Sequence, residues 1–515
     1  MGVKKQFKRT LLSAAFTLGF AAAGTANAFD WLMAQGTEPV GASVAAKPWG
    51  FIQAYYQKDF SDPTTAQIGA VGQPGSIAPG SFNNPKLLGP NLNSQSMFNV
   101  SHAQFGLRGT PFPLDDHVNY MFLVEAGNAA TNVYSSVTNT ATTPGTAVGS
   151  VNNGVVVTDA SVTLNYLEGA RIRVGLFKYP GAEEGLQSLA SMDYVNFTEA
   201  TQGLLLERFP NTVYTANTSP VTWTQLQNGY TINSFSTPVG AFRDTGVQVF
   251  DSFQVAKDWN MTYAVMVGNG SGIQWDNVDG KYDTYLYLST EKDIEGGAGV
   301  SKHGLKFFAW NQQGQRLADV TACAAAAING IPVCSAATQN RKLYDRKRSG
   351  VGMKYLAKPF RVTAEYIDAN GMIFEGQDKA SWFFAPQLSA DMAAGLNSGA
   401  TAKGNGWYLD GGWFIPGTKW ELDVRYDTAD FNIGMPDEHK FSKWVFGTQY
   451  NINPLNKVTF NYEMRDFTCT GPGVTLTALN TQTTGLAGLN SCRDVIEPNL
   501  AGVGRRLSVQ VTSAF

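Results

Sequence analysis

The sequence predicts an all-β fold, a transmembrane antiparallel β-barrel of about sixteen strands. Only 15% of the 515 residues are charged, whereas a soluble domain has about 25%, and 54 residues are glycine. Beyond the N-terminus no run approaches the ~20 apolar residues of a membrane helix, which excludes a helical bundle. Instead, segments of about ten residues alternate between apolar and polar side chains, as strands with two different faces do.

The first 28 residues have the pattern of a secretory signal peptide. Four basic residues within 4–9 precede an apolar stretch over 11–23, and 26–28 read Ala-Asn-Ala, a cleavage site of the A-x-A type. We therefore expect 1–28 to be removed, 29–48 to form a short N-terminal segment, and 49–515 to form the barrel. The full chain has a net charge of −3, so no basic excess indicates a nucleic-acid partner.

The clearest strand is the last one, 506–515. Leu507, Val509, Val511 and Phe515 share one face, and polar side chains occupy the other. A chain that ends on a phenylalanine in register with the apolar face resembles the terminal strand of bacterial outer-membrane barrels. In chain order, we expect strands at 52–56, 103–108, 118–125, 162–166, 172–176, 245–249, 261–267, 282–288, 305–310, 351–355, 362–366, 407–415, 420–427, 444–451, 457–465 and 506–515.

Three of these segments, 52–56, 282–288 and 305–310, are less distinct because apolar residues fall on both faces. Closure of the sheet follows from physics: hydrocarbon offers no hydrogen-bond partner, so a membrane sheet must pair its own edges. Alternation then assigns the apolar face to lipid and the polar face to the lumen.

The predicted connections alternate between two kinds. Short ones at 110–117, 168–170, 251–258, 357–360, 416–419 and 453–456 would face the periplasm. The long ones at 58–96, 128–154, 178–242, 314–343, 368–405, 428–440 and 466–504 would face outward. The four cysteines fall in two close pairs within the outer connections, and an even number suits an oxidising compartment. We expect two local disulfides from Cys323, Cys334, Cys469 and Cys492.

The run R-I-R-V-G-L-F-K-Y-P at 171–180, followed by Glu184 and N-F-T-E at 196–199, resembles a strand and third loop of the phosphate-selective porin O and P family. Segments 243–248, 263–270, 406–408, 424–427 and 447–454 resemble later strands of the same family in the same order. The resemblance implies a sixteen-stranded barrel with an inward-folded third loop, a homotrimer, and an anion-preferring pore in the outer membrane of a Gram-negative bacterium. The family's helical stretch after the signal is not matched in 29–48.

Selectivity in such a pore comes from its diameter and from charged side chains at close range. The residues expected to line the pore and attract anions are Arg108, Arg171, Arg173, Lys178, Arg346, Arg348, Lys354, Arg361 and Arg425. A separate set of acidic residues is expected in the third loop: Glu183, Glu184, Asp193 and Glu199. The expected function is passive diffusion of small hydrophilic solutes, mainly anions such as phosphate or related oxyanions. Two alternatives stay open: a barrel that docks a periplasmic or surface partner such as a redox protein, and a general or cation-tolerant porin.

We expect no enzyme, since the four histidines are scattered and lack metal-site or catalytic spacing. No cofactor and no metal site are expected. The expected partners are outer-membrane lipid, small anionic solutes and further copies of the chain.

Overall fold

The computed structural model describes residues 30–35, 46–60, 96–110, 115–127, 155–206, 242–273, 277, 280–297, 302–328, 331–373, 401–436, 438–473, 475, 490, 493 and 504–515. Within the two longest strands, the side chains of 317–342 lie outside this description. Residues 1–29, which include the predicted signal peptide, also lie outside it. The first strand begins at Lys47, two residues before the predicted start of the barrel.

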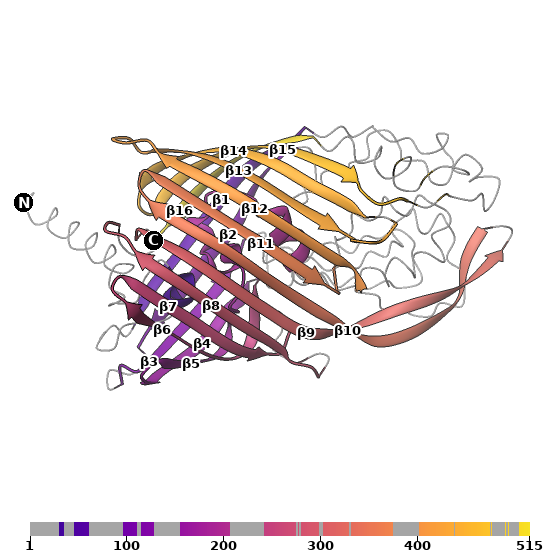
Figure 1. The fold of residues 1–515 in the computed structure, drawn as a ribbon, viewed down its shortest axis with the longest axis horizontal. Coiled ribbons are helices and arrows are strands. Elements are labelled where there is room, and N and C mark those ends of the chain that lie inside the picture. The colour runs from indigo at the N-terminus through magenta and orange to yellow at the C-terminus, as the bar shows by residue number, and fades with distance from the viewer. Residues whose placement is uncertain are drawn as a thin grey trace, which may run out of the picture.

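Sixteen antiparallel strands form one closed barrel, so the predicted fold class is confirmed (Figure 1). Each strand pairs with its neighbours in the chain, and the first strand pairs with the last to close the sheet. The strands are β1 Lys47–Asp59, β2 Ser96–Gly109, β3 Val118–Glu125, β4 Val156–Leu167, β5 Ala170–Lys178, β6 Arg243–Ala256, β7 Trp259–Gly268, β8 Asp283–Asp293, β9 Gly304–Ile328, β10 Ile331–Ala357, β11 Phe360–Asn370, β12 Lys403–Phe414, β13 Trp420–Phe431, β14 His439–Asn453, β15 Asn456–Cys469 and β16 Arg505–Ala514.

The barrel wall is apolar outside and mainly polar inside, the reverse of a soluble protein. On β13, Leu422 and Val424 are 45% and 41% exposed, whereas their neighbours Asp423 and Arg425 are buried toward the lumen. The same alternation recurs around the sheet, so a continuous apolar band covers its outer surface. Such a band far exceeds the apolar patches that water tolerates, and it matches the lipid-facing surface of a membrane barrel. Among the described residues, no helix is both long enough and apolar enough to cross a membrane.

Val265 tests the assignment of this outer face. It lies toward the middle of β7 opposite Leu286 of β8, and both side chains are about half exposed. Val265→Arg should lower the free energy of unfolding in lipid vesicles by about 2–4 kcal/mol, because a charge would lie in hydrocarbon. Urea titration measures the change, with Val265→Leu as the control. A change within error of the control would show that this face does not contact lipid.

The predicted long loop at 314–343 is wrong. β9 and β10 continue through it as a two-stranded hairpin that extends beyond the barrel (Figure 1). The sequence carried the signal: Asn329-Gly330 is a typical hairpin turn, and the flanking residues include Val320, Thr321 and Val333, which favour strands. The loop was predicted because the long connections as a group are rich in glycine, serine, threonine, asparagine and proline.

Three of the four cysteines correspondingly lie in strands rather than in loops. Cys323 and Cys334 belong to β9 and β10, where Cys323 pairs with Ala337 and Cys334 with Ala325. The two are therefore not directly opposite each other. Cys469 is the last residue of β15, and Cys492 lies outside the described residues. Both disulfides stay predictions.

Candidate functional site

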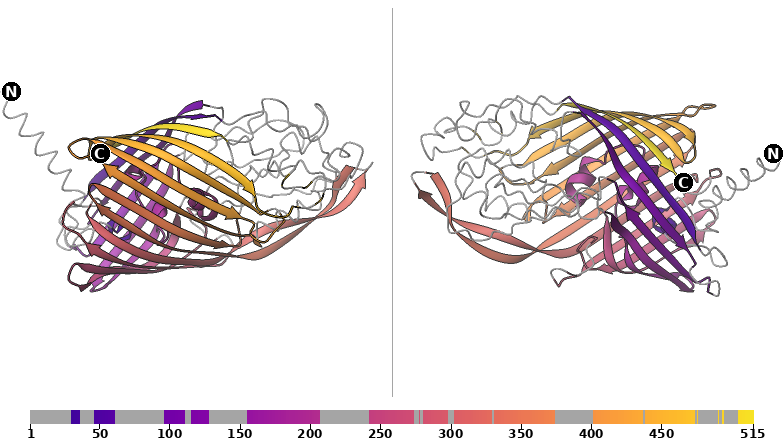
Figure 2. Two further views of the ribbon diagram at one scale, coloured as in Figure 1. Left: turned by 45° about the horizontal axis from the view of Figure 1, so that its top comes forward. Right: turned by 180° about the vertical axis from the view of Figure 1, so that it is seen from behind.

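The candidate site is the described part of the connection between β5 and β6, residues 179–206, which we call the third-loop segment. It contains α4 Glu183–Leu186, η2 Leu189–Ser191 and η3 Ala200–Leu205. These short helices lie inside the ring of strands (Figure 2). Gln57 of β1 donates to Asn196 at 3.0 Å, while Asn196 donates to Glu463 of β15 at 2.5 Å. The segment therefore contacts the inner wall where the barrel closes, far from its own strands.

At one end of the segment, Glu183 is held by two lysines. Lys306 of β9 lies 2.6 Å from its carboxylate and Lys354 of β10 lies 3.0 Å away, and all three side chains are buried or nearly so. Burial by itself raises the pKa of Glu183, but the two positive charges outweigh it and lower that pKa to about 2. This ion-paired cluster fixes α4 to the β9–β10 wall.

The low pKa of Glu183 predicts acid sensitivity. Because the pKa is about 2 in the folded protein and 4.5 ordinarily, the carboxylate stabilises the fold above about pH 4.5, and this contribution is lost as the pH falls toward 2. The loss amounts to about 3 kcal/mol. Urea titrations of wild type and Glu183→Gln at a series of pH values measure it. Their difference in unfolding free energy should shrink over that window, and a pH-independent difference would contradict the assignment.

Further along, Asp193 joins a cluster around one guanidinium. Arg361 of β11 contacts Asp193 at 3.1 Å, Glu421 at 2.6 Å and Asp423 at 2.5 Å, and it also contacts Asp410. Burial raises the pKa of Asp193, but Arg361 and a neighbouring lysine lower it overall. Four carboxylates around one arginine make this the most acidic part of the site among the described residues.

The centre of the segment is anchored to β13 and β14. Arg425 lies 3.1 Å from Asp427 and 3.5 Å from Glu184, and its guanidinium stacks 4.2 Å from the ring of Tyr194. Lys443 lies 2.9 Å from Glu199. Each of the four predicted acidic residues therefore pairs with a basic side chain of the barrel wall.

The last turn, η3, is held through its backbone. Arg346 donates to the carbonyl of Leu205 at 3.1 Å, and Arg348 donates to that of Leu204 at 2.6 Å. Close packing on β12 requires a glycine, because a Cβ at Gly406 would lie 2.7 Å from the Cβ of Ala200. Arg346 and Arg348, whose side chains are both buried, therefore stabilise the third-loop segment by binding its backbone carbonyl groups.

The remaining predicted basic residues come from the opposite wall. Lys178 donates to the carbonyl of Gln187 at 2.7 Å, and Arg171 lies 3.4 Å from Asp251. Arg108 and Arg173 donate to backbone carbonyls of residues 34 and 35, which precede β1. All nine predicted basic side chains are thus on the inner side of the barrel, and most hold a segment that lies inside it.

An apolar core lies inside the barrel next to α4. Tyr285 and Tyr287 of β8 and Phe308 and Trp310 of β9 point inward and pack with Leu186. This explains why apolar residues fall on both faces of 282–288 and 305–310: one face meets lipid and the other meets the third-loop segment.

Sequence reasoning missed three lysines that contact the segment, Lys306, Lys443 and Lys457. The last donates to the carbonyl of Met192 at 2.5 Å. Lys306 and Lys457 stand at polar positions of predicted strands, so their inward direction was readable, but their contacts depend on the path of the third-loop segment. Lys443 immediately precedes a predicted strand.

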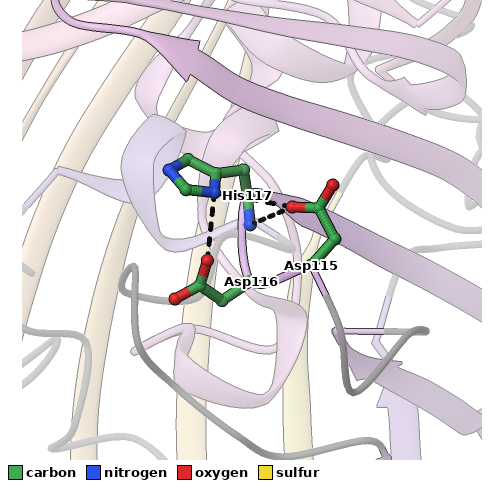
Figure 3. Close-up of side chains that lie close together, drawn as sticks. All are labelled: Asp115, Asp116 and His117. Carbon is green, nitrogen blue, oxygen red and sulfur yellow. Dashed lines mark hydrogen bonds and ion pairs between the residues drawn. The ribbon is translucent and has the colours of Figure 1, made fainter.

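A separate group of potential metal ligands lies in the short turn before β3 (Figure 3). His117 Nδ1 is 3.0 Å from Asp116 and 3.5 Å from Asp115. A hydrogen bond from Tyr166 lowers the pKa of Asp115. The group faces solvent and its atoms already bond one another, so we assign no metal to it.

No protein-family model and no curated protein matches this chain. Solved structures of similar fold include an anion-selective porin from Comamonas acidovorans, with 12% identity, a TM-score of 0.45, and coverage of 91% of this chain and 99% of that one. Outer-membrane expressed OmpT of Vibrio cholerae has 9% identity, a TM-score of 0.44, and coverage of 92% and 99%. The outer membrane channel DcaP of Acinetobacter baumannii has 8% identity, a TM-score of 0.43, and coverage of 91% and 97%. These likenesses concern the fold alone.

Proposed function

We propose that this chain is an outer-membrane porin for the passive diffusion of small hydrophilic solutes. The observation that carries the proposal is a closed barrel with an apolar outer band, whose polar lumen is crossed by a segment ion-paired to its walls. A closed sheet with an apolar outer band is compatible with a lipid bilayer, and a polar lumen can hold water and hydrophilic solutes. The proposal includes export through the signal peptide at 1–28 and a place in a Gram-negative outer membrane.

We also propose a preference for small anions such as phosphate or related oxyanions. Nine predicted basic side chains lie on the inner side of the barrel, and rings of lysine and arginine favour anions in pores. A weakly selective general porin is the second candidate. The observation that favours it is the cluster of four carboxylates around Arg361.

Liposome swelling tests the diffusion function. Vesicles that contain the purified protein should swell in isotonic solutions of small sugars, faster for smaller solutes, while empty vesicles should not. Swelling at the rate of empty vesicles would contradict a porin and would favour the remaining alternative, a barrel that docks a partner protein.

Two further parts of the proposal concern covalent and quaternary structure. The homotrimer implied by the family resemblance is tested by crosslinking in native detergent extracts. Disulfides within the pairs Cys323/Cys334 and Cys469/Cys492 are tested by peptide mapping without reductant, where each expected pair gives one linked peptide that disappears on reduction.

A further inference from the structure

A second segment lies inside the barrel: residues 30–35, which we call the N-terminal segment. Its one-turn helix α2, Trp31–Ala34, is capped by Asp30, whose carboxylate accepts from the backbone of Leu32 at 2.9 Å. The other carboxylate oxygen accepts from Ser289 of β8 at 2.9 Å. Leu32 is fully buried and Met33 is 2% exposed. The segment packs with α4 in the apolar core and is therefore held in a defined position inside the barrel.

The end of the N-terminal segment contacts the barrel wall through two backbone carbonyl oxygens, those of Ala34 and Gln35. The guanidinium of Arg173 donates to the carbonyl of Gln35, and that of Arg108 donates to the carbonyl of Ala34 at 3.4 Å. Guanidinium groups bind carboxylates and phosphates most strongly, through paired hydrogen bonds. A backbone carbonyl is a weaker acceptor in the same place.

Arg173 differs from Arg171, Arg361 and Arg425, each of which forms an ion pair with a carboxylate. Within the described part of the chain, no carboxylate lies within ion-pair distance of it, and its Nη1 has no hydrogen-bond partner although the side chain is 1% exposed. Its guanidinium lies 4.4 Å from the ring of Phe250 and 5.5 Å from that of Phe177. The ring faces hold a desolvated cation in place without neutralising it.

Gln248 extends this unsatisfied surface. It stands directly opposite Arg173 in the pairing of β5 and β6, and Thr163 stands opposite Arg173 on the other side. Gln248 is fully buried, yet neither its amide nitrogen nor its amide oxygen has a partner among the described residues. Buried polar groups are normally satisfied, so two adjacent unsatisfied donors indicate a missing acceptor.

We propose that Arg173 and Gln248 form a subsite for a small oxyanion, and that the N-terminal segment is an internal competitor that covers it. The carbonyl of Gln35 takes the position of one anion oxygen on Arg173. An arriving oxyanion accepts hydrogen bonds from Arg173 Nη1 and from the amide nitrogen of Gln248, and the segment is displaced. This inference rests on the proposed anion preference, since it names where in the lumen the anion binds.

Hydrogen exchange of the detergent-solubilised full-length mature chain tests the competition with inorganic phosphate as the probe. In wild type, phosphate should accelerate exchange of the amides of 31–35, about tenfold when phosphate stands at ten times its dissociation constant. Arg173→Gln should exchange quickly without phosphate and should not respond to it. Lys292→Gln, which removes an exposed cation at the end of β8, is the matched control and should behave as wild type.

Two results would overturn the proposal. One is exchange of 31–35 in wild type that phosphate does not change. The other is a phosphate response that survives in Arg173→Gln, which would place the anion elsewhere. If Arg173→Gln does not fold, hydrogen exchange of 31–35 with and without phosphate is compared between wild type and Gln248→Met instead. Gln248→Met is expected to lose the phosphate response. Exchange is read without any current, so a protein that does not conduct would refute the proposed function and leave this result standing.

Discussion

Replacing Arg361 with glutamine is expected to shift the reconstituted channel strongly toward cations and to loosen the third-loop segment. The substitution leaves Asp193, Asp410, Glu421 and Asp423 without the guanidinium that they share. The uncompensated charges should lower the free energy of unfolding by about 3–5 kcal/mol, as for a broken buried ion pair. Carboxylates that remain ionised attract cations into the lumen.

Reversal potentials in planar bilayers under a salt gradient measure the shift for Arg361→Gln, and urea titration measures the stability. Lys419→Gln is the control, because Lys419 lies in the short turn before β13 and is exposed. An unchanged reversal potential in a folded variant would show that ions do not pass this cluster.

Glu183→Gln is expected to release α4 from the β9–β10 wall. Lys306, which is fully buried, and Lys354 would each lose the ion pair with Glu183. Removal of one partner of a buried pair costs about 3–5 kcal/mol at neutral pH. We expect lower stability, together with noisier channel openings as the third-loop segment moves.

Single-channel recordings and urea titrations at neutral pH check the Glu183→Gln prediction. Glu168→Gln is the matched control, since Glu168 lies exposed in the turn between β4 and β5. A variant as stable and as quiet as this control would contradict an anchoring role for Glu183.

The barrel itself could be predicted from the sequence because lipid enforces a simple rule. Positions that face the hydrocarbon are mainly apolar, so the alternation on β13 and β16 repeats around the sheet with little interference. The inner face obeys no such rule. On β8 and β9 it meets Leu186 and the rest of an internal apolar core, which no local pattern reveals.

The candidate site could be predicted only in part, for a related reason. Alternation gave the inward direction of Arg361 and Arg425, and the family resemblance supplied the acidic third-loop residues. Which charge meets which depends on the path of residues 179–206 through the lumen, a long-range property. The N-terminal segment is a stronger case, because a single turn at 31–34 carries no periodic signal.

The reversal potential of the purified wild-type protein in a planar bilayer, under a gradient of potassium chloride, tests whether this chain is an anion-preferring porin. We expect stepwise conductance with a reversal potential displaced toward that of chloride, and a block by added phosphate. A reversal potential displaced toward that of potassium would contradict the anion preference. Absence of any conductance by folded protein would contradict the porin itself.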